Sequence, residues 1–412
     1  MIMQDNEKKP ALRFKGFTDP WEQRKLDEIA NFSKGVGYSK NDLCEEGTPI
    51  ILYGRLYTKY ETSIFDVDTF VKGKAGSVYS KGGEVIVPAS GETAEDISIA
   101  SVVVKPGILL GGDLNIVSPT TEYDSAFLAL TISSGAAHKY LSSLAQGKSV
   151  VHLHNADIQS VSAKFPTKRE QEKIHLLFGK IDTLITLHQR KYEKLVNIKK
   201  SMLNKMFPPN GASVPEIRFK GFTDPWEQRK LGDVADIVGG GTPSTNNPNY
   251  WDGDIDWYAP AEIAGQIYFD SSQRKITEQG YENSSAKMLP PGTVLFTSRA
   301  GIGKTAILSK KGCTNQGFQS IVPHDDELDS YFVFSRTDEL KQYGELVGAG
   351  STFVEVSGKQ MAAMNLKMPT TIEEQQTIGR FFKRLDTLIT LHQRKLEKLQ
   401  NIKKSCLEKM FV

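Results

Sequence analysis

The same 14-residue sequence occurs twice in this chain, and the repetition constrains the fold more than any other feature. RFKGFTDPWEQRKL occupies residues 13–26 and again residues 218–231, at an offset of 205. DTLITLHQRK recurs at 182–191 and 386–395, at an offset of 204. The 412 residues therefore form two copies of one unit. Its length far exceeds that of solenoid repeats and predicts a tandem duplication with a pseudo-two-fold axis.

The interiors of the two copies differ. Residues 31–163 and 236–366 share only fragments, such as GGEVIVPAS against PGTVLFTSR. Short apolar runs bounded by Gly, Pro and Ser predict strands, and residues 125–144 and 330–347 each predict a single helix. Each copy is thus expected to be a mixed α/β unit that keeps one fold. Because the surfaces differ, the two copies should bind two different targets of one kind.

A basic segment follows each interior. Residues 168–207 carry a net charge of +6 and residues 372–412 a net charge of +4, whereas residues 1–167 and 208–371 carry −3 and −5. Apolar residues in both basic segments recur at alternating spacings of three and four, which predicts a long coiled-coil helix. The predicted helix seam consists of Ile181, Leu184, His188, Leu195 and Ile198 in the first segment and of Leu385, Leu388, His392, Leu399 and Ile402 in the second.

We expect the two helices to pack against each other in antiparallel orientation, because a pseudo-two-fold axis perpendicular to them relates the copies in that way. At 1.5 Å per residue, about 33 residues make a rod of about 50 Å. The alternative, in which each helix packs only on its own unit, requires a wider apolar stripe. His188 and His392 are expected to fix the helix register, with metal binding as the alternative. The second copy begins soon after the first helix, so by symmetry the two chain ends should lie close together.

The composition excludes several classes of protein. The 51 basic and 49 acidic residues nearly balance, which argues against coating nucleic acid by charge alone. Cys44, Cys313 and Cys406 lie too far apart in the sequence for a metal or redox motif. The sequence has neither an apolar run of about 18 residues, as a membrane span needs, nor a secretory signal at its start. A cytoplasmic protein without a metal site is the expectation.

Three segments resemble enzyme motifs, and each departs from its motif. SRAGIGKT (298–305) has a serine in place of the first P-loop glycine and lies between two strand-like runs, which favours a hairpin turn. NPNY (247–250) resembles a methyltransferase loop, but no glycine-rich cofactor motif precedes it. His152 and His154 supply only two potential metal ligands. We therefore expect neither catalytic residues nor metal ligands.

Several motifs in fixed order resemble the specificity subunit of type I restriction–modification enzymes. They are RFKGFTDPWEQRKLGDVADI, then GGGTPS with NPNYWDGDIDWYAPAEI, then VLFTSRAGIGKTAI, and finally MPTTIEEQ before the last helix. The resemblance covers nearly the whole chain. The first copy lacks the GGTPS and SRAGIG stretches, so its recognition domain is expected to belong to another specificity class.

The resemblance implies a non-catalytic, sequence-specific DNA-binding subunit. Target recognition domains at 1–167 and 208–371 would each read one half of a bipartite, asymmetric site on double-stranded DNA. Spacer helices at 168–207 and 372–412 would set the distance between the halves and dock two methyltransferase subunits. Restriction subunits, which combine translocase and nuclease, would complete the complex. S-adenosylmethionine, ATP and Mg²⁺ are implied only for these partners, and no cofactor is implied for this chain. An enzyme acting alone and a coiled-coil adaptor that never touches DNA are the alternatives.

Polar and basic loop residues are the candidate DNA contacts, since arginine favours guanine edges or phosphate. For each of them, ordinary surface solvation is the alternative. Trp251 and Trp257 are expected in the core rather than stacked on bases. The candidates are Lys34, Tyr38, Lys40, Arg55, Tyr57, Lys59, Ser90, Thr93, Lys148, Ser149 and His152 in the first copy, and Thr242, Ser244, Thr245, Arg299, Lys304, Ser351 and Thr352 in the second.

Overall fold

A computed structural model describes residues 9–147, 150–209, 211–263, 265–299, 301–349 and 355–411. The chain divides into two compact units. Unit 1 comprises Met1–Arg190 and His392–Val412, and unit 2 comprises Lys191–Leu391. Each unit therefore combines one variable interior with parts of both basic segments.

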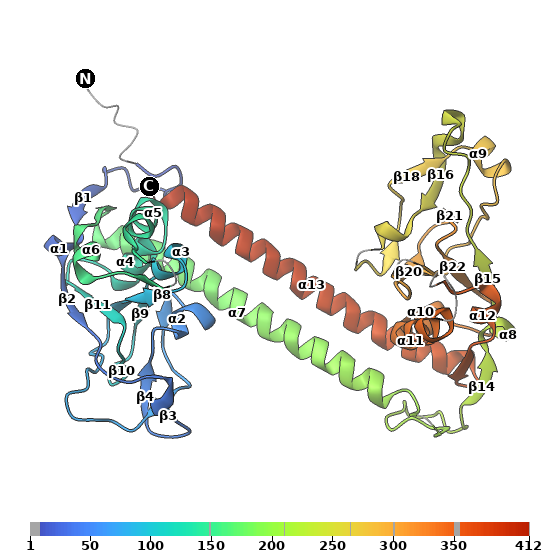
Figure 1. Ribbon diagram of the computed structural model, residues 1–412, viewed down its shortest axis with the longest axis horizontal. Coiled ribbons are helices and arrows are strands. Elements are labelled where there is room, and N and C mark those ends of the chain that lie inside the picture. Colours follow the sequence, from blue (N-terminus) through green and yellow to red (C-terminus); the bar gives the residue numbers. More distant parts are fainter. Residues whose placement is uncertain are drawn as a thin grey trace. The chain divides into compact units, whose positions relative to one another are not determined.

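Unit 1 is built on a five-stranded sheet of order β2-β11-β7-β9-β5, accompanied by a four-stranded sheet of order β10-β4-β6-β3 and the two-stranded ribbons β1-β13 and β12-β8 (Figure 1). Its strands are β1 (Glu22–Lys25), β2 (Ala30–Lys34), β3 (Leu43–Cys44), β4 (Thr48–Ile51), β5 (Ser63–Ile64), β6 (Phe70–Val71), β7 (Glu84–Pro88), β8 (Ser90–Gly91), β9 (Ser101–Val103), β10 (Leu109–Leu110), β11 (Leu114–Pro119), β12 (Val151–His152) and β13 (Ser162–Phe165). Its shorter helices are α1 (Leu26–Ile29), η2 (Lys40–Asp42), α2 (Arg55–Thr58), α3 (Ala94–Ile97), α4 (Ser125–Ile132), α5 (Gly135–Leu144) and α6 (Asn155–Ser160).

Unit 2 has a five-stranded sheet of order β15-β22-β19-β20-β17, a three-stranded sheet of order β18-β16-β21 and the ribbon β14-β23. Its strands are β14 (Glu227–Lys230), β15 (Ala235–Gly239), β16 (Trp251–Tyr258), β17 (Tyr268–Phe269), β18 (Arg274–Ile276), β19 (Val294–Phe296), β20 (Thr305–Leu308), β21 (Cys313–Thr314), β22 (Gln319–Pro323) and β23 (Asn365–Met368). Its shorter helices are α8 (Leu231–Val234), η3 (Pro248–Tyr250), η4 (Pro260–Glu262), α9 (Glu278–Glu282), α10 (Ser330–Ser335), α11 (Thr337–Gly348) and α12 (Gly358–Ala362).

The two five-stranded sheets have the same plan. In both, the strand of the sheet that comes first in the chain pairs antiparallel with the one that comes last, in a register that places Ala30 opposite Pro119 and Ala235 opposite Pro323. In both, the edge strand farthest from this pair runs parallel to its neighbour. The expectation that both copies keep one fold is confirmed. The smaller sheets also correspond, with β10-β4-β6 of unit 1 matching β21-β16-β18 of unit 2, and unit 1 adds the edge strand β3.

The two helices expected as single elements are each broken. Residues 125–144 form α4 and α5, because Ser133 and Ser134 donate their hydroxyls to the carbonyls of Ala129 and Leu130, and Gly135 adopts a φ of 63° that favours glycine. Local polar bonds and one glycine therefore end the helix, although the apolar spacing continues through the break.

In unit 2 the break between α10 and α11 falls at Arg336. Its buried guanidinium donates to the carbonyl of Lys367 and to the carboxylate of Glu339. The break between the two helices coincides with a buried, hydrogen-bonded arginine. The spacing of apolar residues in the sequence gives no sign of this arginine's burial.

The long helices are α7 (Lys168–Lys205) and α13 (Ile372–Met410). In unit 1, Lys403 Nζ lies 2.6 Å from Asp182 Oδ1, and the Nδ1 atoms of His188 and His392 are 2.8 Å apart. The numbers rise along α7 as they fall along α13, so the helices are antiparallel within this unit. The same orientation holds in unit 2, where Lys199 Nζ lies 2.6 Å from Asp386 Oδ1. The predicted antiparallel pairing is confirmed.

The predicted seam residues differ in burial. Ile181 and Leu385 are buried. His188, Leu195, Ile198, His392 and Leu399 are half-buried. Leu184, Leu388 and Ile402 are 43%, 43% and 40% exposed, so the helix pair does not enclose these three side chains.

The repeated blocks anchor both helices by the same contacts. Arg13 donates to both carboxylate oxygens of the buried Glu170 at 2.7 and 2.8 Å, and Arg218 makes the same pair with Glu374. The apolar cores of both units also include the end of a long helix. Phe411 lies 5.4 Å from Phe127 between ring centroids in unit 1.

Backbone hydrogen bonds tie the start of each copy to a helix end. Leu12 N–H donates to the carbonyl of Lys409 at 3.0 Å, and Ile217 N–H donates to the carbonyl of Lys205 at 2.9 Å. The expectation that the beginning and end of the chain lie close together is therefore confirmed for the described residues. None of the described helices combines the length and apolar character that a bilayer span requires.

Candidate nucleic-acid interface

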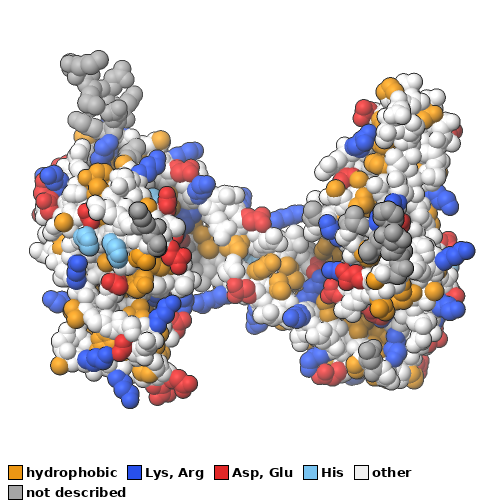
Figure 2. All heavy atoms as spheres, in the orientation of Figure 1, with side chains coloured by type: hydrophobic (Ala, Val, Ile, Leu, Met, Phe, Trp, Pro, Cys, Tyr) orange, Lys and Arg blue, Asp and Glu red, His pale blue; other side chains and the backbone are white. Residues whose placement is uncertain are grey.

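Of the eighteen candidate contact residues, four lie outside the described residues: Lys148, Ser149, Ser351 and Thr352. The others occupy loops and short strands of both units, except that Lys40 lies in η2 and Arg55 and Tyr57 lie in α2. Figure 2 shows basic and acidic side chains interspersed over the visible face of each unit. Any recognition surface there must consequently rely on particular side chains rather than on a uniform basic field.

Three candidates of unit 1 meet at the β8-β12 ribbon. Ser90 in β8 lies opposite His152 in β12, and its Oγ is 3.1 Å from His152 Nδ1. The Tyr57 hydroxyl donates to the carbonyl of Ser90 at 2.5 Å. Burial raises the pKa of the Tyr57 phenol, so this hydroxyl remains a neutral donor. The exposed His152 ring is thus held by a buried serine, which leaves its Nε2 as the second polar atom of the ring.

Thr93 has a local role beside this group. Its Oγ1 accepts the backbone N–H of Asp96 at 3.1 Å and donates to the Asp96 carboxylate at 2.7 Å. The hydroxyl therefore caps α3, a common task of threonine at a helix start.

A second group forms around Tyr38, which has a left-handed φ of 60°. Its hydroxyl oxygen lies 2.6 Å from Ser77 Oγ and accepts the backbone N–H of Lys74 at 2.7 Å. Lys74 Nζ lies 2.6 Å from Asp42, and this hydrogen bond lowers the pKa of Asp42 to about 2. Sequence reasoning missed Lys74. The candidates Lys34 and Lys40 are exposed.

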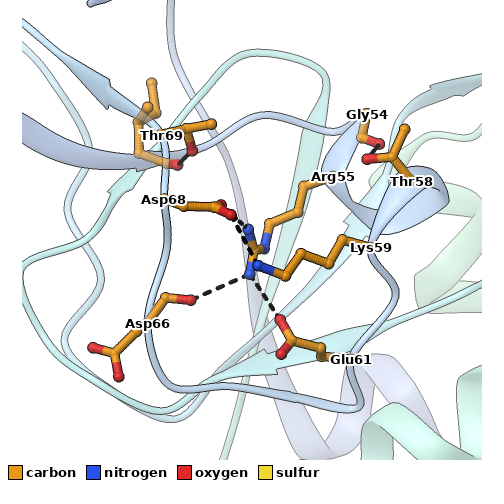
Figure 3. A network of polar contacts seen from close by, with 9 residues as sticks. Gly54, Arg55, Thr58, Lys59, Glu61, Asp66, Asp68 and Thr69 are labelled. Carbon is orange, nitrogen blue, oxygen red and sulfur yellow. Dashed lines mark hydrogen bonds and ion pairs between the residues drawn. The ribbon is translucent and has the colours of Figure 1, made fainter. Parts of the chain in front are cut away.

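Arg55 is the centre of an internal network, shown in Figure 3. Its guanidinium lies 2.7 Å from Glu61 and 2.8 Å from Asp68, and it donates to the carbonyl of Asp66 at 3.2 Å. Lys59 Nζ also reaches Asp68, at 2.9 Å. Because the Arg55 side chain is only 8% exposed, contact with DNA would require these bonds to open.

In unit 2, Thr242 and Arg299 meet at Gln316. Arg299 Nη2 donates to the Gln316 carbonyl at 2.6 Å, and the Thr242 hydroxyl bonds to the Gln316 side chain. Arg299 Nε is also 3.6 Å from Glu355. The carbonyl of Ser244 accepts the indole N–H of Trp251 at 3.2 Å. The candidates Ser244, Thr245 and Lys304 are exposed.

The predicted hairpin at 298–305 is confirmed. β19 and β20 pair antiparallel on its two sides, with Phe296 opposite Thr305. A strand therefore follows the glycines where a P-loop needs a helix. The described residues contain no cluster of three or more His, Cys, Asp or Glu side chains suited to a metal ion.

Trp251 and Trp257 belong to the core, as predicted. They are 7% and 6% exposed, and their rings meet edge to face with centroids 5.1 Å apart. The guanidinium carbon of Arg274 lies 3.7 Å from the Trp251 ring centroid. Sequence reasoning missed Arg274 because it searched loops, and Arg274 begins β18. The sequence did contain one indication of this contact, namely an arginine that follows a segment with two tryptophans at a short distance in the chain.

A family model described as "Type I restriction modification DNA specificity domain" matches residues 18–197 and 223–401. The chain is 35% identical over 190 residues to the type I restriction enzyme MjaIX specificity subunit of Methanocaldococcus jannaschii. That alignment covers 45% of this chain and 44% of the relative. The chain is 28% identical over 170 residues to the EcoR124I/EcoR124II specificity subunit of Escherichia coli, covering 39% of this chain and 41% of that relative.

Two comparisons extend over nearly the whole chain. The putative MjaX specificity subunit of M. jannaschii is 22% identical over 405 residues, which covers 94% of this chain and 91% of the relative. The crystal structure of a type I restriction–modification S subunit from M. genitalium superposes with a TM-score of 0.67 at 14% identity, covering 98% of this chain and 99% of that one. At this identity, the superposition supports the fold alone.

Proposed function

Because the chain belongs to the type I restriction–modification DNA specificity family, with the family's domain present twice, we propose that its two recognition domains each read one half of a bipartite, asymmetric site on double-stranded DNA. Membership of this family identifies the chain as a non-catalytic DNA-recognition subunit. The finer proposal concerns how recognition is divided between the domains.

One observation carries this division. The sheets of the two units share one strand plan, since β10-β4-β6 of unit 1 corresponds to β21-β16-β18 of unit 2. The residues of the two interiors are nevertheless largely unrepeated, and unit 1 adds the edge strand β3 to its smaller sheet. A common scaffold that carries different side chains and loops suits two readers of different base sequences. An asymmetric site follows, since two identical readers related by a pseudo-dyad would favour a palindrome.

The long helices are the proposed docking sites for two methyltransferase subunits. Leu184 and Leu187 of α7 are 43% and 44% exposed, and their repeat equivalents Leu388 and Leu391 of α13 are exposed to the same extent. Exposed apolar side chains at equivalent positions support one docking surface per copy. Restriction subunits with translocase and nuclease activity would join this assembly, and the complex would work in the cytoplasm. S-adenosylmethionine, ATP and Mg²⁺ would belong to these partners.

Charge supports a division of labour in DNA binding. Residues 1–167 and 208–371 have net charges of −3 and −5, so they are poorly suited to neutralising many phosphates. We propose that this chain supplies the base contacts and that the methyltransferase subunits supply much of the phosphate binding. The chain alone should therefore bind its site more weakly than the complex at the same salt concentration.

Long-read methylation mapping tests the proposal. Cells that express the chain with its cognate methyltransferase subunits should methylate one bipartite motif, and deletion of the chain should abolish methylation of that motif. An unchanged methylome would support an adaptor that does not touch DNA. Turnover by the purified chain, supplied with S-adenosylmethionine or Mg²⁺, would contradict the non-catalytic role.

A further inference from the structure

The β16-β18 pair of unit 2 carries an arginine in an unusual setting. Arg274 lies opposite Trp257 in the register of the two strands. Its guanidinium carbon is 3.7 Å from the ring centroid of Trp251 and 6.0 Å from that of Trp257. A separation of 3.7 Å places the cation directly against the indole face, where the ring quadrupole attracts it.

Arg274 differs from the other arginines of the two recognition domains. Within the described parts of residues 1–167 and 208–371, it is the arginine for which no carboxylate partner is found. The others form ion pairs, namely Arg13, Arg24, Arg55, Arg218, Arg229, Arg299 and Arg336. The Arg274 side chain is also exposed, although both tryptophans beneath it are buried. Its N–H groups are therefore available to a ligand from solution.

Stacking prepares this side chain for planar recognition. An arginine presents its N–H donors in the plane of the guanidinium, in a fork that matches the O6 and N7 acceptors of guanine. Contact with Trp251 restricts that plane before any ligand arrives. Less side-chain freedom is then lost on binding, which favours affinity and geometric selectivity.

The surrounding charge favours a base over a phosphate as the ligand. β16 carries Asp252, Asp254 and Asp256 within one strand, and the first two are exposed. Lys275 Nζ lies 3.6 Å from Asp256 and partly neutralises the charge of that carboxylate. No ion pair of Asp252 or Asp254 is found among the described residues. The acidic character of β16 makes the approach of a phosphate to this strand pair less favourable, whereas the edge of a guanine is uncharged.

We propose that Arg274 reads a guanine in the half-site bound by unit 2. The proposal rests on the DNA-recognition function proposed above. It assigns one position of the recognised sequence to one side chain, which the two tryptophans hold in place.

Substitutions in the assembled methyltransferase complex test this assignment. Arg274→Lys keeps a cation against Trp251 but loses the fork of donors, and Arg274→Met keeps an apolar cover over the indole but loses the charge. Each variant should reduce the preference for guanine at one position of one half-site by about 10-fold or more. The other half-site should remain unchanged. Arg24→Met is the matched control, since Arg24 is an exposed arginine that already pairs with Glu22.

The readouts are the methylated motif in cells and binding of the purified complex to DNA duplexes changed one base pair at a time. A motif that stays unchanged in both variants would overturn the assignment, even if the melting temperature falls. A uniform loss of affinity for all duplexes, with a shallower salt dependence, would indicate a phosphate contact and also overturn it. Absence of any bipartite motif with the unmodified chain would instead refute the underlying function. If Arg274→Met does not fold, Arg274→Lys decides the question.

Discussion

The carboxylate of Asp386 lies 2.6 Å from the ammonium nitrogen of Lys199, which joins α13 to α7 within unit 2. The other oxygen of Asp386 accepts the hydroxyl of Tyr331 at 2.9 Å. Asp386 is buried, and burial raises the pKa of the Tyr331 phenol, so Tyr331 stays a donor at neutral pH. One carboxylate thus connects the helix pair to a helix of the recognition domain.

Asp386→Asn should lower the free energy of unfolding by about 2–3 kcal/mol, as the Lys199 charge would lose its partner. The expected loss is below that of a fully buried pair because the Lys199 side chain is 29% exposed. Urea denaturation measures the change.

Asp182→Asn is the matched variant in unit 1. Asp182 pairs with Lys403 at 2.6 Å and accepts the Thr62 hydroxyl at 3.1 Å, but its side chain is 29% exposed. We expect a smaller loss of about 1 kcal/mol, since solvent screens this pair. Equal losses from the two variants would show that burial does not determine the strength of these links.

The stability of unit 1 should depend on pH through the charge of one histidine, His175. His175 Nδ1 lies 3.2 Å from Asp124 Oδ2, and this hydrogen bond raises the pKa of His175. Burial alone would raise the pKa of Asp124, but hydrogen bonds from His175 and from the Phe127 N–H lower it overall. The repeat equivalent of His175 is Gly379, so unit 2 lacks the pair.

The signs define a window of stability. The His175 contribution is fully present below the unfolded pKa of about 6.5 and is lost as pH rises through the higher folded value. The Asp124 contribution is present above an unfolded pKa of about 3.9 and is lost as pH falls through the lower folded value. His175→Gln should therefore destabilise the chain at pH 5.5 more than at pH 8.5, by less than about 1 kcal/mol because the His175 side chain is 35% exposed. Unfolding curves at both pH values test this, and equal losses would exclude a contribution from histidine charge.

The frame of the molecule could be predicted from sequence because its signals are repeated or periodic. The duplicated blocks predicted one fold for both copies. The heptad spacing around Ile181 and Leu385 predicted the long helices, and the pseudo-two-fold axis predicted their antiparallel packing. Short apolar runs located the three central strands of each five-stranded sheet, but not the edge strands β2, β5, β15 and β17. Each of these features depends on patterns that recur along the chain.

Features set by single polar contacts were harder to predict. The breaks at Gly135 and Arg336 interrupt segments whose apolar spacing is continuous. Arg55 reads as a basic loop residue in the sequence, yet Glu61, Asp66 and Asp68, which follow it within 13 residues, accept its hydrogen bonds. Arg274 shows the opposite case. Only the fold reveals that its guanidinium lies over two tryptophan rings and has no carboxylate partner among the described residues. Local charge balance depends on tertiary neighbours, which a linear pattern does not contain.

A circularly permuted chain should fold to the same structure. Leu12 is hydrogen-bonded to Lys409 in unit 1 as Ile217 is to Lys205 in unit 2, and a short linker joins the second pair. If the two chain ends were linked and the chain were opened within residues 208–213, the new linker would connect unit 1 where the old one connected unit 2. We expect an unchanged circular dichroism spectrum and a loss of unfolding free energy below about 1 kcal/mol. An insoluble permutant would contradict the pseudo-dyad, provided that a linear control with an equally long C-terminal extension stays soluble.

Lengthening both helices tests whether they measure the distance between half-sites. Seven residues inserted after Gln189 and again after Gln393 preserve the heptad pattern and lengthen the rod by about 10 Å. If the helices act as a ruler, the preferred spacer of the bipartite motif should grow by about three base pairs, at about 3.4 Å each, with both half-sites unchanged. Methylation mapping gives the spacer directly. The matched control inserts four residues at each position, which breaks the heptad register, and we expect it to reduce the free energy of unfolding rather than shift the spacer cleanly. A seven-residue variant that folds and methylates the original spacer would show that the spacing is set elsewhere in the complex.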